Sequence, residues 1–399
     1  MNNLKSYQMQ LLDLVSFALF GDEKYKTTIT SEILMEANAH AVLTLLSVER
    51  EKFPEAYIAH AQTLVNNVRV DYEHSEAHRL MSQAKIPYVI LKGSASASYY
   101  PEVLFRTMGD VDILIEKSNL PKVDAILCEN GFSQIKDNVH ECHLAYYKTV
   151  YGTTSTWEVH WKPVGIPQSE VGLIIEDYLK DIITTAELYS ASEGQIYIPS
   201  DFYHGLTMLL HVAEHLTTTG IGLRHLCDWA VFVAKFSDAE FCEVFETKLK
   251  SVGLWRFAQL LTQVSVKYLH CPAKHWCGAG DDEYLSRLIA DIMNSGNFGR
   301  KDANRINQLK LMPNMKSGKE EDVSLLKQFF LTMNEKARRG MPITAKIPLL
   351  LPVGWIYVGG RHLIRIKQKK RPAIDVKNMI SGAAERKEIY KEFRLFEVD

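Results

Sequence analysis

The stretch that decides the fold is Leu91-Lys92-Gly93-Ser94, followed about sixteen residues later by Gly109-Asp110-Val111-Asp112-Ile113-Leu114-Ile115. The first quartet ends in a glycine-serine turn, and the second stretch is an apolar run headed by two aspartates. In a strand, residues two apart point to the same face, so Asp110 and Asp112 would lie side by side. Because like charges so close repel unless a cation lies between them, the pattern predicts a divalent-metal site beside a phosphate-binding turn.

The composition is that of an ordinary globular protein. Hydrophobic residues make up 46% of the 399 residues and charged residues 24%, with a formal net charge of -2. The length predicts two or three domains, and the charge argues against a globally basic nucleic-acid binder. The six cysteines are spread along the chain, which favours reduced thiols. Neither a signal peptide nor an apolar run of about 18 residues is found. We therefore expect a cytoplasmic protein without integral membrane insertion.

The order of the apolar patterns predicts an α+β protein in which helical regions flank a small mixed sheet. Residues 1–85 are expected to form an N-terminal helical region, with apolar stripes at 11–19 and 41–48. Residues 86–198 are expected to form the α/β domain, and residues 199–399 a C-terminal helical region. Within the α/β domain, strands are predicted at 88–91, 111–115, 132–135, 143–148 and 156–161, a turn at Tyr151-Gly152, and helices at 95–100 and 120–130, the latter capped by Ser118 and ended at Gly131.

The residues of this domain suit magnesium and phosphate. Magnesium takes carboxylates and phosphate oxygens, and two ions about 4 Å apart can hold both the attacking and the leaving oxygen. The turn at Gly93 lets backbone N–H groups approach a phosphate, and the Ser94 hydroxyl adds a donor. A third carboxylate is expected from another strand of the sheet. Glu158, in the run Trp157-Glu158-Val159-His160-Trp161, is the candidate, and His160 shares its face.

These motifs resemble those of the polymerase-β-like nucleotidyltransferase superfamily, which combines a Gly-Ser turn, Asp-x-Asp on a strand and a third acid on a neighbouring strand. More narrowly, the chain resembles the bacterial uncharacterised nucleotidyltransferase family. The motifs that carry this resemblance lie within residues 86–162: Leu91-Lys92-Gly93, Tyr100-Pro101, Arg106, the run at 109–115 and Glu158-Val159-His160-Trp161. The resemblance implies a polymerase-β-like catalytic domain over 86–198, followed by helices.

The same resemblance implies roles for individual residues. Gly93 and Ser94 would hold the triphosphate of an NTP such as ATP, and Asp110 and Asp112 would bind both Mg²⁺ ions, with Mn²⁺ as the alternative metal. Glu158 would bind the metal on the acceptor side and take the proton of the acceptor hydroxyl. The reaction would transfer an NMP group from the α-phosphorus and release pyrophosphate. The alternative is a non-catalytic nucleotide-binding or interaction module on the same fold.

Two basic residues near the motif allow two interpretations each. Lys92 either contacts phosphate or points away into solvent. Arg106 either binds the triphosphate or pairs with a site carboxylate, and both roles would make its loss harmful. The acceptor is not given by the sequence, because a small hydroxylated molecule, a peptide, a protein side chain and an RNA end all fit three carboxylates.

Two further patterns lie on the helices after residue 199. His211-Val212-Ala213-Glu214-His215 fits the inverted zinc-protease pattern, but the third ligand that a zinc hydrolase needs has no obvious candidate. His211 and His215 would otherwise line the nucleotide or acceptor pocket, or simply pack. Arg224 and Asp228, four residues apart, either support their helix or face the same cleft.

A basic segment follows the apolar run at 347–358. Its members are Arg361, Arg365, Lys367, Lys369, Lys370 and Arg371. A solvated helix face, contact with an anionic membrane surface and contact with an RNA acceptor are the three interpretations that the sequence allows.

Overall fold

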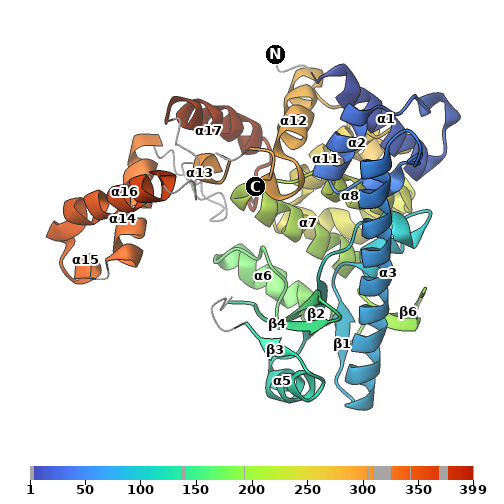
Figure 1. Ribbon diagram of the computed structural model, residues 1–399, viewed down its shortest axis with the longest axis horizontal. Coiled ribbons are helices and arrows are strands. Elements are labelled where there is room, and N and C mark those ends of the chain that lie inside the picture. Colours follow the sequence, from blue (N-terminus) through green and yellow to red (C-terminus); the bar gives the residue numbers. More distant parts are fainter. Residues whose placement is uncertain are drawn as a thin grey trace.

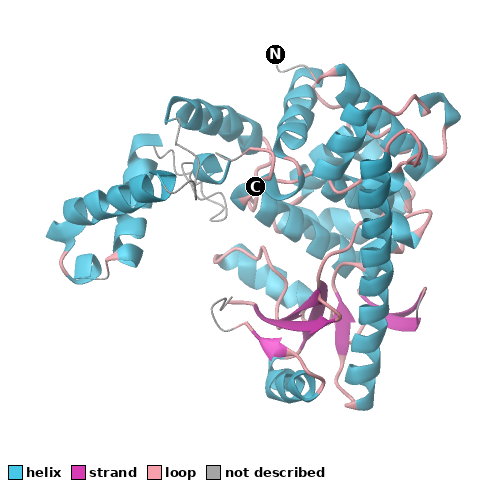
Figure 2. Ribbon diagram, in the orientation of Figure 1, coloured by secondary structure: helices cyan, strands magenta, loops and turns pink. Residues whose placement is uncertain are grey.

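The computed structural model describes residues 4–135, 141–192, 194–302, 305–309, 325–341, 343–367 and 376–398. It shows an α+β architecture, in which one mixed sheet lies against a larger helical body (Figures 1 and 2). This fold class agrees with the one that the sequence predicts.

The sheet has five strands in the order β1-β2-β5-β4-β3. The strands are β1 Tyr88–Ile90, β2 Val111–Ile115, β3 Ser133–Gln134, β4 His143–Val150 and β5 Thr153–His160. Strands β2 and β5 are parallel, and the other neighbours are antiparallel. Tyr151 and Gly152 join β4 to β5 with φ of 49° and 79°, values that suit the tight turn of a hairpin. The five predicted strands and this turn are confirmed.

The two faces of the sheet belong to different apolar clusters. The side chains of Val111 and Ile113 on β2 pack into the cluster beneath the sheet, with Val159 of β5. Leu114 points the other way and belongs to the core of the helical body. Because side chains alternate along a strand, Asp112 shares the face of Leu114 and points toward the helices.

Three helices and a hairpin accompany the sheet: α3 Pro54–Gln83, α5 Leu120–Glu129, α6 Glu170–Leu179, and the pair β6 Glu187–Ala191 and β7 Gly194–Ile198. Helix α3 runs along the sheet (Figure 1) and contributes Val70, Ala77 and Met81 to the apolar cluster beneath it. Backbone N–H of Tyr197 on β7 donates to the Tyr88 hydroxyl on β1 at 3.4 Å, which attaches the hairpin to the sheet.

The helical body combines the N-terminal helices with helices that follow the sheet and its hairpin. Its helices are α1 Ser6–Phe20, α2 Ser31–Ala39, α7 Asp201–Thr218, α8 Leu223–Ala234, α9 Asp238–Phe241, α10 Thr247–Ser251, α11 Trp255–Tyr268, α12 Asp282–Ser295, α13 Arg305–Leu309 and α17 Val376–Lys391. The short helix α4 Ser94–Ala97 follows β1 and contacts α8 of this body. Helices α14 Leu325–Gly340, α15 Ile343–Lys346 and α16 Leu351–Lys367 project from it (Figure 1).

Two local predictions are wrong. Residues 41–48 form a turn and the single 3₁₀ turn Leu43–Leu45 rather than a helix, because Ala41 has a φ of 55°. The side chains of Leu43 and Leu45 are both buried. The apolar run therefore reflects a segment that is buried on several sides, and not the apolar face of a helix. Ser118 does not cap α5, because it lies inside a 3₁₀ turn and its hydroxyl donates to Glu116 at 3.5 Å.

Among the described residues, no helix is both long and apolar enough to cross a membrane. Of the basic residues after the apolar run, Arg361 is exposed on α16. Lys369, Lys370 and Arg371 lie outside the described residues, and so do the side chains of Arg365 and Lys367.

Candidate active site

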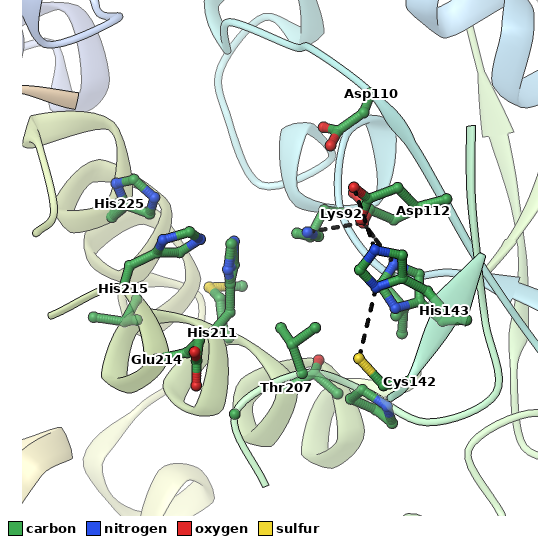
Figure 3. A pocket seen from close by; sticks show the side chains of 18 of the residues that line it. Lys92, Asp110, Asp112, Cys142, His143, Thr207, His211, Glu214, His215 and His225 are labelled. Carbon is green, nitrogen blue, oxygen red and sulfur yellow. Dashed lines mark hydrogen bonds and ion pairs between the residues drawn. The ribbon is translucent and has the colours of Figure 1, made fainter. Parts of the chain in front are cut away.

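A cavity of about 810 Å³ lies where the sheet meets helices α7 and α8. Nearly all of the side chains singled out in the sequence line it: Lys92, Gly93, Arg106, Asp110, Asp112, Glu158, His160, His211, His215, Arg224 and Asp228. Ser94 is the exception. Figure 3 shows the aspartates on one side and the histidines of α7 and α8 on the other. Residues that are far apart in sequence thus line one cavity.

The three carboxylates come from the parallel pair β2 and β5. Asp112 and Glu158 are direct register partners across this pair. Both point toward the cavity, because each lies between apolar neighbours that face the opposite side of the sheet. Asp110 lies one residue before β2 begins and is exposed at the cavity wall. This strand pair therefore positions two inner acids, Asp112 and Glu158, and one outer acid, Asp110.

The inner acids are held by basic partners. Lys92 Nζ lies 2.8 Å from Asp112 Oδ1, and His160 Nε2 lies 3.0 Å from the same oxygen. His160 Nε2 also lies 3.3 Å from Glu158 Oε2. Burial opposes the charge of Asp112, but Lys92 and His160 outweigh it and hold the pKa of Asp112 well below its usual range. Burial likewise opposes the charge of His160, yet its hydrogen bonds to Asp112, Cys142 and Glu158 raise its pKa to about 10.

The outer aspartate has the opposite character. The negative charge of Asp112 raises the pKa of Asp110 above its ordinary value, and Lys92 offsets only part of this. For Glu158, burial disfavours the carboxylate, but the hydrogen bond from His160 lowers its pKa. These three acids, compensated by Lys92 and the protonated His160, form a donor set of oxygens, the chemistry that Mg²⁺ prefers. The residues therefore fit the ion that the sequence predicts.

Gly93 lines the cavity while Ser94 lies behind it. Gly93 has a φ of 63°, and a Cβ there would collide with the imidazole of His74 on α3, so only glycine fits. The Ser94 hydroxyl donates to Asp71 Oδ1 at 2.5 Å and lies 2.9 Å from His74 Nδ1. Ser94 is fully buried and is absent from the cavity wall. Its hydroxyl fastens the turn to α3 rather than facing the cavity.

Arg106 and Asp228 form a buried pair. Nε and Nη2 of Arg106 donate to the two oxygens of Asp228, each at 2.8 Å, and the Tyr100 hydroxyl donates to Asp228 at 2.8 Å. The structure therefore pairs Arg106 with a carboxylate of α8 and not with the acids of β2 and β5. Arg224 donates from Nη1 to the Thr107 carbonyl at 3.1 Å, and its charge lies over the Phe298 ring.

The histidines of α7 meet a third histidine that the sequence did not single out. The rings of His211, His215 and His225 have centroids 4.4 to 5.8 Å apart. Burial, with help from Lys92 and Arg224, lowers the pKa of His215 to about 3, and burial puts those of His211 and His225 well below the usual range. His143 and Cys142, on the carboxylate side, were also missed. No motif in the sequence marks Cys142 or His143, and His225, although it follows Arg224, has no spacing that relates it to His211 and His215.

Comparison with known protein families assigns the chain to one of them. The model of the family described as "Uncharacterised nucleotidyltransferase" matches residues 32–270, which is more than half of the chain. The chain belongs to that family. Searches of curated proteins and of solved structures found no match. For this nucleotidyltransferase family member, the matched span includes the glycine turn, the three carboxylates and the histidines of α7 and α8, whereas Phe298 lies beyond it.

Proposed function

We propose that this protein is a magnesium-dependent nucleotidyltransferase whose catalytic domain is polymerase-β-like. The observation that carries the proposal is the convergence of Asp110, Asp112 and Glu158 on one enclosed cavity that Gly93 also lines. The reaction would move an NMP group from an NTP to an acceptor hydroxyl and release pyrophosphate. The cytoplasm is the proposed compartment.

The carboxylates would hold the metal. Asp110, Asp112 and Glu158 supply oxygen ligands from two adjacent strands, and magnesium bound there would neutralise phosphate charge and orient the reacting oxygens. Lys92, now paired with Asp112, lies where it can turn toward a phosphate when the acids gain another cation. Arg224 adds a second positive charge on the opposite wall. Both cations would favour a triphosphate in the cavity.

The proton of the acceptor hydroxyl would go to Glu158. Its carboxylate is 23% exposed, whereas that of Asp112 is 1% exposed and already accepts from two partners. Glu158 is thus the inner acid that an acceptor can reach. His160 positions it, since Nε2 of this ring lies within 3.3 Å of both inner carboxylates.

Label transfer tests the proposal. The full-length protein is incubated with α-³²P-labelled NTPs, Mg²⁺ and pools of small hydroxylated molecules, peptides and RNA, and pyrophosphate release is followed in parallel. Loss of metal-based charge stabilisation is worth several kcal/mol, so Asp110→Asn with Asp112→Asn should slow transfer roughly 100- to 1000-fold. Asp177→Asn, on the exposed face of α6, is the matched control and should transfer label at the wild-type rate.

Two outcomes would contradict the proposal. Transfer that survives the double substitution at Asp110 and Asp112 would place the chemistry elsewhere. Nucleotide binding that depends on Mg²⁺, without pyrophosphate release for any acceptor pool, would favour the non-catalytic nucleotide-binding module.

A further inference from the structure

We propose that His211, His215 and His225 form a binding site for one divalent transition-metal ion, of which Zn²⁺ is the representative. This site is separate from the carboxylates of β2 and β5 and does not depend on the nucleotidyltransferase reaction. Candidate ligand atoms of the three histidines lie within 4.8 Å of one another.

The two helices bring the rings together by different means. His211 and His215 are one helical turn apart on α7, so their side chains lie on the same face. His225 is in the first turn of α8 and reaches the same point from the neighbouring helix. The linker between the helices is short, so the three rings are fixed by the α7–α8 corner.

The spacing of the rings suits a shared ion. Imidazole nitrogens bind zinc at about 2.0 to 2.1 Å, so three rings around a tetrahedral ion have centroids about 5 Å apart. The observed centroid separations are 4.4 Å between His211 and His215, 5.8 Å between His211 and His225, and 5.5 Å between His215 and His225. The ligand atoms of such a site lie about 3.3 Å apart, which side-chain rotations can reach.

The polar atoms of the cluster are poorly satisfied by protein. Nδ1 of His211 and Nε2 of His225 are buried, and neither has a hydrogen-bond partner among the described residues. His225 is only 4% exposed. A buried polar atom without a partner destabilises the fold, so the converging rings are unfavourable unless something binds them. An ion held by the rings would remove part of this cost.

One ring is already oriented as a ligand. His215 Nδ1 lies 3.1 Å from the Thr219 hydroxyl oxygen, and donation to that oxygen leaves Nε2 with a lone pair. For His225, the Gly222 N–H approaches Nδ1 at 3.4 Å. Binding through Nε2 would move the ring proton to Nδ1, so this long contact would be lost and two N–H groups would face each other. The bond to the metal would have to offset that loss.

Phe298 supports the rings from outside the family match. Its ring lies 4.8 Å from that of His215 and 5.3 Å from that of His225. Its φ of 56° is strained for a phenylalanine, and such strain is concentrated at functional sites. The fourth position of the ion would face the cavity, which all three histidines line, and would take water or a donor atom of a molecule bound there.

The donor set separates this ion from magnesium. Imidazole nitrogens suit Zn²⁺ and its transition-metal neighbours, whereas Mg²⁺ takes oxygens. Figure 3 shows the histidines and the aspartates on opposite sides of the cavity. Among the described residues, two other groups could also hold a metal ion, Cys142–His143–His160 and Asp112–Glu158–His160, and both lie on the carboxylate side. A test must therefore distinguish three donor sets.

Zinc retention provides that test. The full-length protein is stripped with a chelator, mixed with one equivalent of ZnCl₂, gel-filtered and analysed by mass spectrometry for metal. The wild type should retain about one zinc ion per chain. His211→Gln, His215→Gln and His225→Gln should each lose it, whereas Asp112→Asn should retain it. His275→Gln, an exposed histidine elsewhere, is the matched control and should also retain zinc.

Three results would overturn the site: a wild type that retains no zinc, histidine variants that all retain it, or loss in Asp112→Asn but not in His225→Gln. If a variant does not fold, X-ray absorption of zinc on the wild type decides. Scattering from three imidazoles and no sulfur supports the site, and a shell with sulfur or mainly carboxylate oxygens contradicts it. No nucleotide is present in these assays, so their failure is distinct from failure of the nucleotidyltransferase proposal.

Discussion

Asp110 and Asp112 are close in the chain but have different electrostatic surroundings. Asp112 is 1% exposed and contacts Lys92 and His160, which keep it ionised. Asp110 is exposed, and its pKa is raised by the charge of Asp112. An incoming cation therefore meets a fixed, charged inner ligand and an outer ligand whose ionisation the cation itself would promote.

Ser94→Ala should lower stability more than nucleotide affinity. The hydroxyl bonds Asp71 and His74 behind the glycine turn, so its removal leaves two buried groups without a partner. The expected loss is about 1 to 3 kcal/mol in the free energy of unfolding, measured by urea denaturation. Ser82→Ala, on the exposed end of α3, should change it by less than about 0.5 kcal/mol. An unchanged stability with a several-fold higher KM for nucleotide would instead place the hydroxyl on the triphosphate.

Arg106→Ala should be among the most destabilising substitutions at the cavity. Among the described residues, it leaves the buried Asp228 carboxylate with only the Tyr100 hydroxyl as donor. Breaking one partner of a buried pair costs about 3 to 5 kcal/mol, which urea denaturation would measure. Arg79→Ala breaks a surface pair with Glu76 and should cost at most about 1 kcal/mol. Equal losses for the two variants would show that Asp228 is solvated when Arg106 is removed.

The sheet was predictable because local patterns determine its strands. The run of 111–115 is apolar on both sides of Asp112, and Tyr151-Gly152 is a turn signal, so both were found from sequence. The attachment of α3 was not predictable. Its sheet-facing residues, such as Val70 and Ala77, are set by tertiary packing and not by a feature of their own segment.

The site was predictable to the extent that its residues come in motifs. Glu158 was found because it lies in a strand pattern, and the structure makes it the register partner of Asp112. His225 follows Arg224 on α8, but no spacing in the sequence relates it to His211 on α7, so their approach was not predictable. Ser94 was assigned to phosphate because the turn motif does not reveal which side of the turn a hydroxyl takes. Its partners lie on α3, some twenty residues earlier.

Helix α2 is fastened by Glu36, and this contact should fail in acid. Glu36 Oε1 accepts from Gln8 at 2.8 Å and from Lys301 at 2.5 Å. Burial opposes its charge, but hydrogen bonds from His40, Gln8 and Lys301 lower its pKa to about 2. A depressed carboxyl pKa stabilises the fold above the unfolded-state pKa, about 4.5, and this contribution is lost as pH falls toward 2.

Wild type and Glu36→Gln should therefore differ in their pH dependence. Near pH 7 the wild type should be more stable by on the order of 1 to 3 kcal/mol, and the difference should shrink between about pH 4.5 and pH 2. Urea denaturation at a series of pH values measures it. Glu49→Gln, at a surface pair with Lys52, should show little difference at any pH. A Glu36 difference that stays constant in acid would mean that the contact does not depend on charge.

The residues after the family match complete the cavity. The match ends at residue 270, yet Phe298 lines the cavity beside His215 and His225. The segment that carries Phe298 lies between α12 and α13, and a contact between these two helices holds it in place. There, Arg305 of α13 donates to both oxygens of Asp291 on α12, at 2.9 and 2.7 Å. The C-terminal helices therefore support the wall on which the proposed metal site depends.

Tyr390 on α17 completes this set of contacts, and its substitution tests whether the C-terminal helices support the cavity wall. Its hydroxyl donates to Asp291 Oδ2 at 2.9 Å and accepts from Arg305 Nη2 at 2.6 Å, which joins α17 to α12 and α13. Tyr390→Phe keeps the ring and leaves buried charged groups one bond short, so a loss of about 1 to 3 kcal/mol is expected in urea denaturation. Tyr357→Phe, on α16, is the control, since Tyr357 is 43% exposed.

Hydrogen exchange shows where the effect of Tyr390→Phe is felt. If α17 holds the wall, amides of α17 and of the segment 296–302 should both exchange faster in the variant than in the wild type, because they open as one unit. The sheet should keep its protection, since most apolar side chains of β2 and β5, such as Val111 and Val159, pack in the cluster beneath the sheet and not in the helical body. Faster exchange in α17 alone would separate this helix from the cavity. In that case, the contacts of Tyr390 would stabilise α17 but would not support the segment that carries Phe298.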